Sequence, residues 1–267
     1  MQRENSEAFR IIGAERIGSS PILLVCDHAS NAVPAEYGGL GLPAAEFERH
    51  IAWDPGAALL TEALGSRLSA PAVLSCFSRL LIDPNRGTDD PTLVMRLSDG
   101  TIVPGNRHVT RTEIEARIAR FHDPYHRAIE QAIEHALALG TGPALISLHT
   151  FTPVWRGTPR PWHAGILWDR DDRLARIFLA GLRADPDLVI GDNQPYHGRL
   201  ENDCMHRHGT SRGLAHVLIE VRNDLLATAE GIAQWCDRIA GILEEALADS
   251  GARMMIGQVR LPLARAE

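Results

Sequence analysis

The sequence predicts an α/β fold. Short apolar runs without polar–apolar alternation recur along the chain, which is typical of strands buried on both faces of a sheet. Stretches with apolar residues at helical spacing separate these runs. The 267-residue chain shows no internal repeat, low-complexity segment or dividing linker, so we predict one domain over residues 1–267.

The predicted strands are short and apolar, and polar residues follow most of them. In chain order we expect strands over Pro21–Cys26, Ala72–Phe77, Ala144–Leu148, Ala164–Trp168 and Ala215–Val221. The regions between them include three long segments rich in turn-forming residues. Long loops in α/β domains are more often functional than decorative.

The predicted helices carry start and stop signals. Thr110 and Glu113 form a capping-box pattern, Pro124 predicts an interruption, and Gly140 and Gly251 predict helix ends. The expected helices are Gly56–Leu68, Thr110–His122, Tyr125–Leu139, Arg173–Leu182 and Asp224–Ala248. We expect the last of these to pack on the core rather than to form a dimer face.

The composition excludes several classes of function. The sequence contains no lysine, so all 27 basic residues are arginine. Schiff-base chemistry on lysine and a Walker-type phosphate loop are therefore excluded. Anion recognition must use arginine, which favours bidentate contact with carboxylate or phosphate. The formal net charge of −7 argues against nonspecific binding to nucleic acid or anionic membranes.

The sequence also bears on location. The first residues, MQRENSEAFRIIGAE, lack the apolar core of a signal peptide. No apolar stretch reaches the ~18 residues that a membrane span needs. We therefore expect a cytoplasmic protein.

Chemistry-bearing side chains follow four of the predicted strands. In an open α/β sheet, ligands bind at the carboxyl ends of the strands, so these side chains are expected to converge. They are Asp27, His28 and Asn31 after the first strand, Arg79, Asp83, Asn85 and Arg86 after the second, His149 and Thr150 after the third, and Glu220 and Arg222 at the end of the last.

Two of these residues, His28 and His149, are candidate metal ligands. Catalytic zinc sites use three protein ligands and keep one position open. The third ligand is either Asp54 or Asn31, and we favour Asp54 because a carboxylate oxygen binds zinc better than a neutral amide does. Two alternatives remain: the histidines are hydrogen-bonded loop residues, and Asp54 caps the helix that follows Pro55.

Glu220 lies within an apolar strand, where a carboxylate must be paired, protonated or ligating. It is either a general base for a metal-bound water or half of a buried ion pair with an arginine. Arg79, Arg86 and Arg222 are candidates to bind the carboxylates of a small acidic substrate, and Asn85 adjoins one of them within IDPNRG.

The remaining histidines and the cysteines give weaker signals. His122 and His126 are four residues apart, but Pro124 lies between them, which is more typical of a bent helix surface than of a site. His206 and His208 lie on a predicted loop that could line a pocket. The four cysteines form no C-x-x-C pair: Cys26, Cys76, Cys204 and Cys236.

Five segments, in this order, resemble the N-formylglutamate amidohydrolase family: CDHASNAVP, HIAWDPGA, SRLLIDPNR, SLHTFTPVWRG and LIEVRNDL. The resemblance runs from about residue 21 to 247. It implies a three-layer α/β sandwich with a mixed, mostly parallel central sheet flanked by helices. It also implies a divalent metal, usually Zn²⁺, and hydrolysis of an N-acylated acidic amino acid. The expected reaction converts N-formyl-L-glutamate to formate and glutamate, a late step of histidine degradation.

The resemblance also assigns roles to residues. His28 and His149 match its metal histidines, and Glu220 matches its general base. Related carboxypeptidase-like sites use H-x-x-E, whereas Asn31 occupies the fourth position here, which is why Asp54 is placed as third ligand and Asn31 with the substrate-binding residues. The region expected to hold substrate carboxylates contains Arg79, Asn85 and Arg86.

Two rival functions stay open. One is a deacylase or peptidase on the same scaffold that acts on a larger acyl or peptide substrate. The other is a non-catalytic binding protein for a small acidic ligand, with an incomplete metal site. For the amidohydrolase reading the expected partner is a small acidic N-acyl amino acid, and nothing in the sequence supports a particular oligomer.

Overall fold

The computed structural model describes residues 8–140 and 142–260, which contain a central seven-stranded sheet. Four neighbouring pairs of strands are parallel, whereas β1 on β3 and β9 on β11 are antiparallel. In spatial order the strands are β1 (Phe9–Ile12), β3 (Ala72–Ser75), β2 (Ile22–Cys26), β6 (Ala144–Phe151), β11 (His216–Arg222), β9 (Ala164–Leu167) and β10 (Ile190–Asp192).

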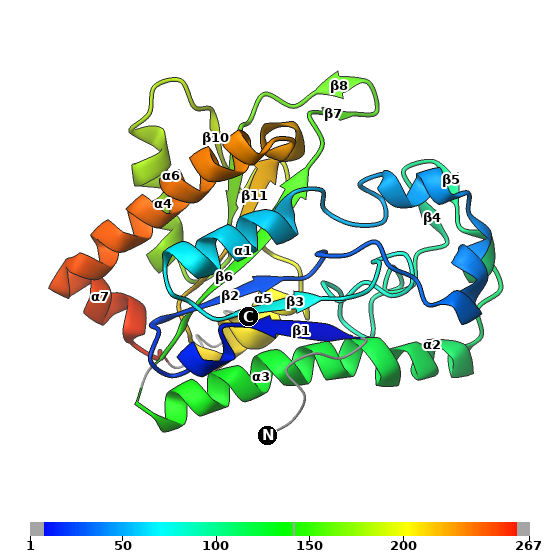
Figure 1. The fold of residues 1–267 in the computed structure, drawn as a ribbon, viewed down its shortest axis with the longest axis horizontal. Coiled ribbons are helices and arrows are strands. Elements are labelled where there is room, and N and C mark those ends of the chain that lie inside the picture. The colour runs from blue at the N-terminus through cyan, green and yellow to red at the C-terminus, as the bar shows by residue number, and fades with distance from the viewer. Residues whose placement is uncertain (1–7, 141, 261–267) are drawn as a thin grey trace, which may run out of the picture.

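Helices cover both faces of this sheet (Figure 1). Alternate residues of β2 enter two separate apolar cores: Ile22, Leu24 and Cys26 face one, and Leu23 and Val25 face the other. The first core is closed by α1 (Ala57–Arg67), α4 (Arg173–Arg183), α6 (Ala229–Ala248) and α7 (Ser250–Gly257), and the second by α3 (Asp123–Ala138) and α5 (Cys204–His208). The predicted α/β sandwich with a mixed, mostly parallel sheet is confirmed.

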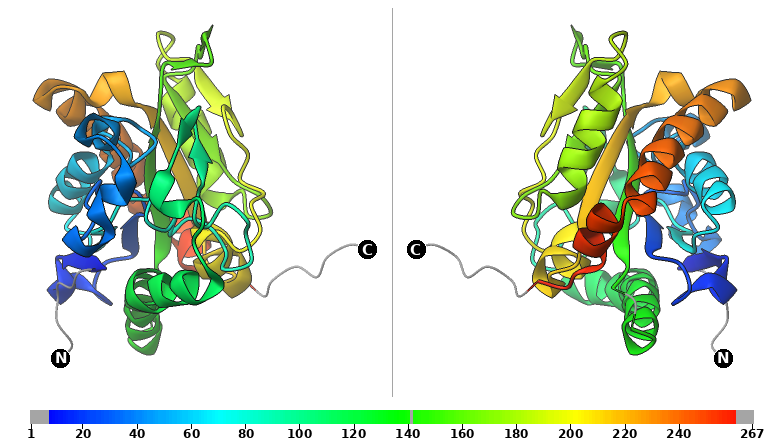
Figure 2. Two further views of the ribbon diagram at one scale, coloured as in Figure 1. Left: turned by 90° about the vertical axis from the view of Figure 1, so that its right-hand side faces the viewer. Right: turned by 90° about the vertical axis from the view of Figure 1, so that its left-hand side faces the viewer.

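Two small hairpins and one further helix lie outside these layers. The hairpin of β7 (Val154–Trp155) and β8 (Thr158–Pro159) stands at the end of the molecule opposite α3, as Figures 1 and 2 both show. The other hairpin pairs β4 (Leu97–Ser98) with β5 (Thr101–Ile102), and α2 (Arg111–Arg117) precedes α3.

All five predicted strands are present, with shifted ends. The shift in β6 matters most, because the strand runs on to Phe151 and so includes His149 and Thr150. The prediction missed β1 and β10, which have only four and three residues and give little pattern to read.

Three predictions about helix boundaries are wrong. Pro124 does not interrupt its helix: a π-helical turn over residues 118–122 joins α2 to α3, and its wider winding accommodates a residue that lacks an N–H. Gly251 does not end a helix, because the Asp249 side chain accepts a hydrogen bond from Ala252 and caps the start of α7. The last long helix begins at Ala229 rather than at Asp224.

Gly165 in β9 lets the segment after β10 approach the sheet. A Cβ at this position would overlap the carbonyl oxygen of Gln194, just before the cavity-lining Tyr196 and His197. We therefore expect Gly165→Ala to destabilise the protein by about 1–3 kcal/mol, as overpacked sites do. Urea unfolding measures this. Gly241→Ala is the control, because its Cβ has open space on α6 and helix propensity should then raise stability. Equal stability of the Gly165→Ala protein and the wild type would contradict the argument.

The helices of the described segments do not include one that is both long and apolar enough to cross a membrane.

Candidate metal and catalytic site

A cavity of about 370 Å³ opens at the carboxyl ends of β2, β6 and β11. The long loops supply much of its wall, as expected for functional loops. The sequence-predicted residues that line it are His28, Asp54, Arg79, Asn85, Arg86, His149 and Glu220. Strands far apart in the sequence therefore bring most of the candidate residues together at the predicted edge of the sheet.

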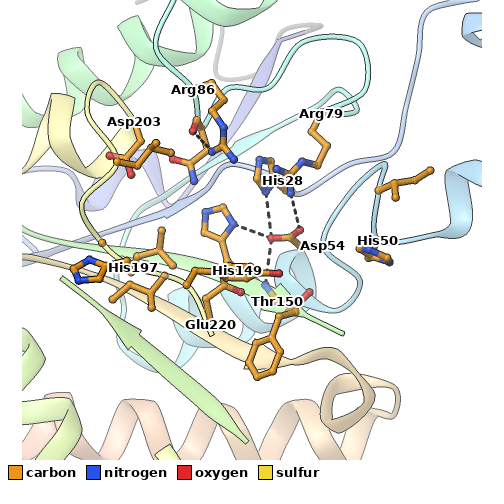
Figure 3. A pocket seen from close by; sticks show the side chains of 18 of the residues that line it. His28, His50, Asp54, Arg79, Arg86, His149, Thr150, His197, Asp203 and Glu220 are labelled. Atoms are coloured by element: carbon orange, nitrogen blue, oxygen red, sulfur yellow. Dashed lines mark hydrogen bonds and ion pairs between the residues drawn. The ribbon is translucent and has the colours of Figure 1, made fainter. Parts of the chain in front are cut away.

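The centre of the site is the carboxylate of Asp54. Its Oδ2 atom lies 2.8 Å from Nδ1 of His149 and 3.3 Å from Nδ1 of His28 (Figure 3). The ring centroids of the two histidines are 4.7 Å apart, and one ring donor atom of each lies within 4.8 Å of the other and of an Asp54 oxygen. All three residues are buried, and this group could hold a metal ion.

Two further aspartates fix the histidine rings. Nε2 of His149 donates to Asp27 at 2.9 Å, and Nε2 of His28 donates to Asp83 at 2.7 Å. A carboxylate only accepts hydrogen bonds, so each Nε2 carries a proton. Nδ1 of His149 likewise donates to Asp54, and a bound metal ion would take the place of that Nδ1 proton. Metal-ligating histidines typically donate their second N–H to a carboxylate in this way.

The two aspartates are themselves held by several donors. Asp27 accepts from the hydroxyls of Tyr125 at 2.9 Å and Ser147 at 3.0 Å. Asp83 accepts from Nη2 of Arg79 at 2.7 Å and from the backbone N–H of Asn85 at 2.9 Å. These bonds fix the orientation of the carboxylates, and through them that of the imidazoles.

The backbone explains why these residues meet. His149 and Glu220 are register partners on the adjacent strands β6 and β11. Asp54 is drawn to the end of β2 because its N–H donates to the carbonyl of His28. Its carboxylate does not cap α1: the N-cap is Gly56, at a φ of 86°, and the Asp54 carboxylate accepts from the N–H of Thr150 instead.

The site concentrates negative charge around its imidazoles. Burial alone would raise the pKa of Asp54, but the charge of His28 and the hydrogen bond from His149 lower it below its usual range. Burial would lower the pKa of His149, but its hydrogen bonds to Asp27 and Asp54 raise it well above the usual value. An arrangement that stabilises positive charge among carboxylates suits a cation.

Glu220 is the unpaired acid of the site. It is buried, and its Oε2 atom has no hydrogen-bond partner among residues 8–140 and 142–260. Burial raises its pKa to about 7, and the nearby charge of His149 opposes this shift. The ion pairs of the described chain do not include Glu220, so the alternative of a buried pair with an arginine is not what the structure shows. A carboxyl titrating near neutrality in a cavity is typical of an acid–base group.

Of the three candidate arginines, Arg79 and Arg86 line the cavity and Arg222 does not. Arg79 lies against the site, with Nη1 3.8 Å from Oδ1 of Asp54, and its buried Nε has no hydrogen-bond partner in the described part of the chain. Arg86 lines the cavity on the loop with Asn85.

Two predicted substrate-binding residues lie elsewhere and do not line the cavity. Asn31 donates to the carbonyl of Phe47, and Arg222 pairs with Asp224.

The comparison with known proteins then identifies the family. A sequence profile described as FGase, N-formylglutamate amidohydrolase, matches residues 20–227. The chain belongs to the N-formylglutamate amidohydrolase family. The resemblance read from the five sequence segments is thereby confirmed, and the chain is placed among enzymes that hydrolyse amides.

Two solved structures share the fold of this chain. A gene product from Agrobacterium tumefaciens is 34% identical with a TM-score of 0.85, covering 91% of this chain and 96% of its own. The N-formylglutamate amidohydrolase from Ralstonia eutropha JMP134 shares the fold, at 21% identity and a TM-score of 0.69, covering 94% of this chain and 100% of its own. None of the curated protein sequences matches the chain.

The sequence pattern gave no role to the residues that orient the amidohydrolase histidines. Asp27 and Asp83 were visible only as polar residues at strand ends, although Asp27 directly precedes His28 after an apolar run. Such a buried Asp-His pair is the one signal that could have pointed to a carboxylate–histidine contact. Tyr125 and Ser147, which hold Asp27, come from α3 and β6 and left no local signal.

Proposed function

We propose that this protein hydrolyses the amide bond of an N-acyl acidic amino acid such as N-formyl-L-glutamate, with a divalent metal ion held by His28, Asp54 and His149. The observation that carries the proposal is the buried group of three donor atoms with an unpaired carboxyl, Glu220, on the neighbouring strand. Family membership supports the amide substrate.

The donor set fits a catalytic metal ion. Two imidazole nitrogens and one carboxylate oxygen are ligands that Zn²⁺ accepts, and three protein ligands leave a position open. The carboxylates of Asp27 and Asp83 stand behind the imidazoles, as in known carboxylate–histidine–metal arrangements. A divalent ion bound there supplies polarisation of the acyl carbonyl and a lower pKa for water. Asp54 provides the oxygen donor that Asn31 does not, so the site has three metal ligands. This argues against the alternative of a non-catalytic binding protein with an incomplete metal site.

Each of four cavity residues has a separate task in the proposed reaction. Glu220 accepts a proton from the attacking water and returns it to the amine nitrogen as the amide bond breaks. The free Nε–H of Arg79 offers hydrogen-bond stabilisation to the negative oxygen that develops on the acyl carbon. Arg86 and Asn85, on the cavity wall, bind a carboxylate of the substrate.

The test is release of formate from N-formyl-L-glutamate. Chelator-treated protein is reloaded with zinc, cobalt or manganese, and product is measured against protein kept in chelator. We expect hydrolysis only after reloading. Absence of product with every metal, on a panel that includes N-formyl, N-acetyl and N-succinyl amino acids, would overturn the proposal.

A second candidate, a deacylase for a larger acyl group, is favoured by the cavity itself. Its volume of about 370 Å³ lies in the range of about 300–1,000 Å³ typical of pockets for drug-sized ligands, so it has room for an amino acid that carries an acyl group larger than formyl. Apolar side chains form part of the wall: Ile51, Phe151, Trp155, Leu167 and Leu218. On the same panel, a kcat/KM that rises with acyl length would favour this candidate over the deformylase.

Asp27→Asn tests the support of His149. The amide keeps the shape of the carboxylate but has one accepting oxygen for the hydroxyls of Tyr125 and Ser147 and for Nε2 of His149. Loss of such a supporting carboxylate typically reduces metal affinity or activity about 10–100-fold. We expect that loss in a metal-competition titration. The control is Asp224→Asn, which is outside the cavity and should behave as wild type. Unchanged metal affinity and kcat in Asp27→Asn would contradict the assigned role.

A further inference from the structure

A second buried group of metal-binding side chains lies beside the candidate site and takes no part in the proposed reaction. It consists of His126 on α3 and of Cys204 and His208 on α5, and we call it the HCH cluster. One donor atom of each residue lies within 4.8 Å of the others, and all three residues are buried. Cys204 and His208 are four residues apart on one helix, a spacing that puts both side chains on the same face.

His126 of the HCH cluster is already oriented as a ligand. Nε2 of His126 lies 2.9 Å from the carbonyl oxygen of Pro84, which can only accept, so Nε2 carries the proton and Nδ1 presents a lone pair. That Nδ1 lies 2.9 Å from Nε2 of His208. Two nitrogens on a tetrahedral zinc ion are about 3.3 Å apart, so a small opening of this contact suffices.

The third donor is a thiol in a polar setting. Cys204 is fully buried near the carboxylate of Asp27, the residue that orients His149. A thiolate beside this carboxylate would place two negative charges together in the interior. A divalent ion on the sulfur would compensate that charge, and Asp27 would keep its bonds from Tyr125, Ser147 and His149.

We propose that His126, Cys204 and His208 form a second, buried zinc site, separate from the group of His28, Asp54 and His149. Thiolate and imidazole together are ligands typical of Zn²⁺. On binding, the thiol proton leaves to solvent. His208, whose Nε2–H donates to Nδ1 of His126 in this structure, moves its proton to Nδ1 so that Nε2 can bind the ion.

The proposed ion has a structural consequence for the cavity. The carbonyl oxygen of Pro84 accepts a hydrogen bond from Nε2 of His126, and the side-chain oxygen of Asn85 accepts one from the backbone N–H of Cys204. The ion would therefore tie α3 and α5 to the loop that carries Asn85 and Arg86, both of which line the cavity. The second site would thus hold the wall of the cavity in place and would take no part in the reaction.

Cobalt spectroscopy tests this proposal, because the first site contains no sulfur. Wild type, Cys204→Ser, Cys236→Ser and His149→Ala proteins are produced in cobalt-containing minimal medium, so that ions enter during folding. We expect a thiolate-to-cobalt charge-transfer band in the near ultraviolet for wild type and His149→Ala. Cys204→Ser should lose the band, and Cys236→Ser, which removes a buried cysteine of α6, should keep it.

Metal analysis of the same proteins gives a second reading. We expect two ions per chain in wild type and one in each of Cys204→Ser and His149→Ala. A wild type without the band, or a band that survives in Cys204→Ser, would overturn the second site and leave the cluster as a hydrogen-bonded pair of histidines. A His149→Ala protein that holds no ion would also overturn the second site. The first site would remain supported if the wild-type protein held one ion per chain.

Discussion

We expect His149→Ala to abolish metal binding at the proposed catalytic site and, with it, hydrolysis. His149 contributes one of three donors, and its Nε2 is bound to Asp27 so that only Nδ1 faces the site. Removal of a residue that merely supports a ligand costs about 10–100-fold in affinity, so removal of the ligand itself should cost more than about 100-fold. Activity with N-acyl amino acids should then fall below detection.

The measurement combines metal affinity with kcat on purified protein that lacks a histidine tag. His135→Ala is the matched control, because His135 is exposed on α3 and lies outside the cavity. It should keep wild-type metal affinity and activity. If His149→Ala binds metal as tightly as wild type does and keeps its kcat, the group of His28, Asp54 and His149 is not the metal site, and the convergent histidines act only as hydrogen-bonded residues.

The architecture was largely predictable because its strands are buried on both faces. Leu23 and Leu24 point into different cores, which removes the polar–apolar alternation and leaves an apolar run that the sequence displays. Edge strands such as β1 and β10 lack such a run. The course of α3 was misread because the effect of Pro124 depends on the π-helical turn before it, which no local pattern reveals.

The site was predictable only in part, for a related reason. His28, His149 and Glu220 stand at or near strand ends, so topology alone brings them to one edge. The position of Asp54 depends on a turn between a loop and α1, and sequence left its role open between ligand and helix cap. The supporting contacts of Asp27 join residues 98, 120 and 122 positions apart, which only the folded chain brings together.

We expect Glu220→Gln to reduce kcat by about 10²–10⁴-fold, the usual contribution of a general acid–base group, with little change in metal content. The amide has the same shape as the carboxyl group but cannot take a proton from water. The stability of this variant separates a catalytic role from a structural one. Oε2 is buried without a partner within residues 8–140 and 142–260, and such a group is costly to keep in a strand.

The melting temperature of Glu220→Gln should therefore equal or exceed that of wild type while its activity is lost, because functional residues are often kept at the expense of stability. Steady-state kinetics, metal analysis and calorimetry on the same preparation give the three readings. A fall in melting temperature together with a normal kcat would show that Glu220 supports the sheet rather than the reaction. A normal kcat alone would require another base, and the described residues that line the cavity offer one other buried carboxyl with a pKa raised to about 7, that of Asp203.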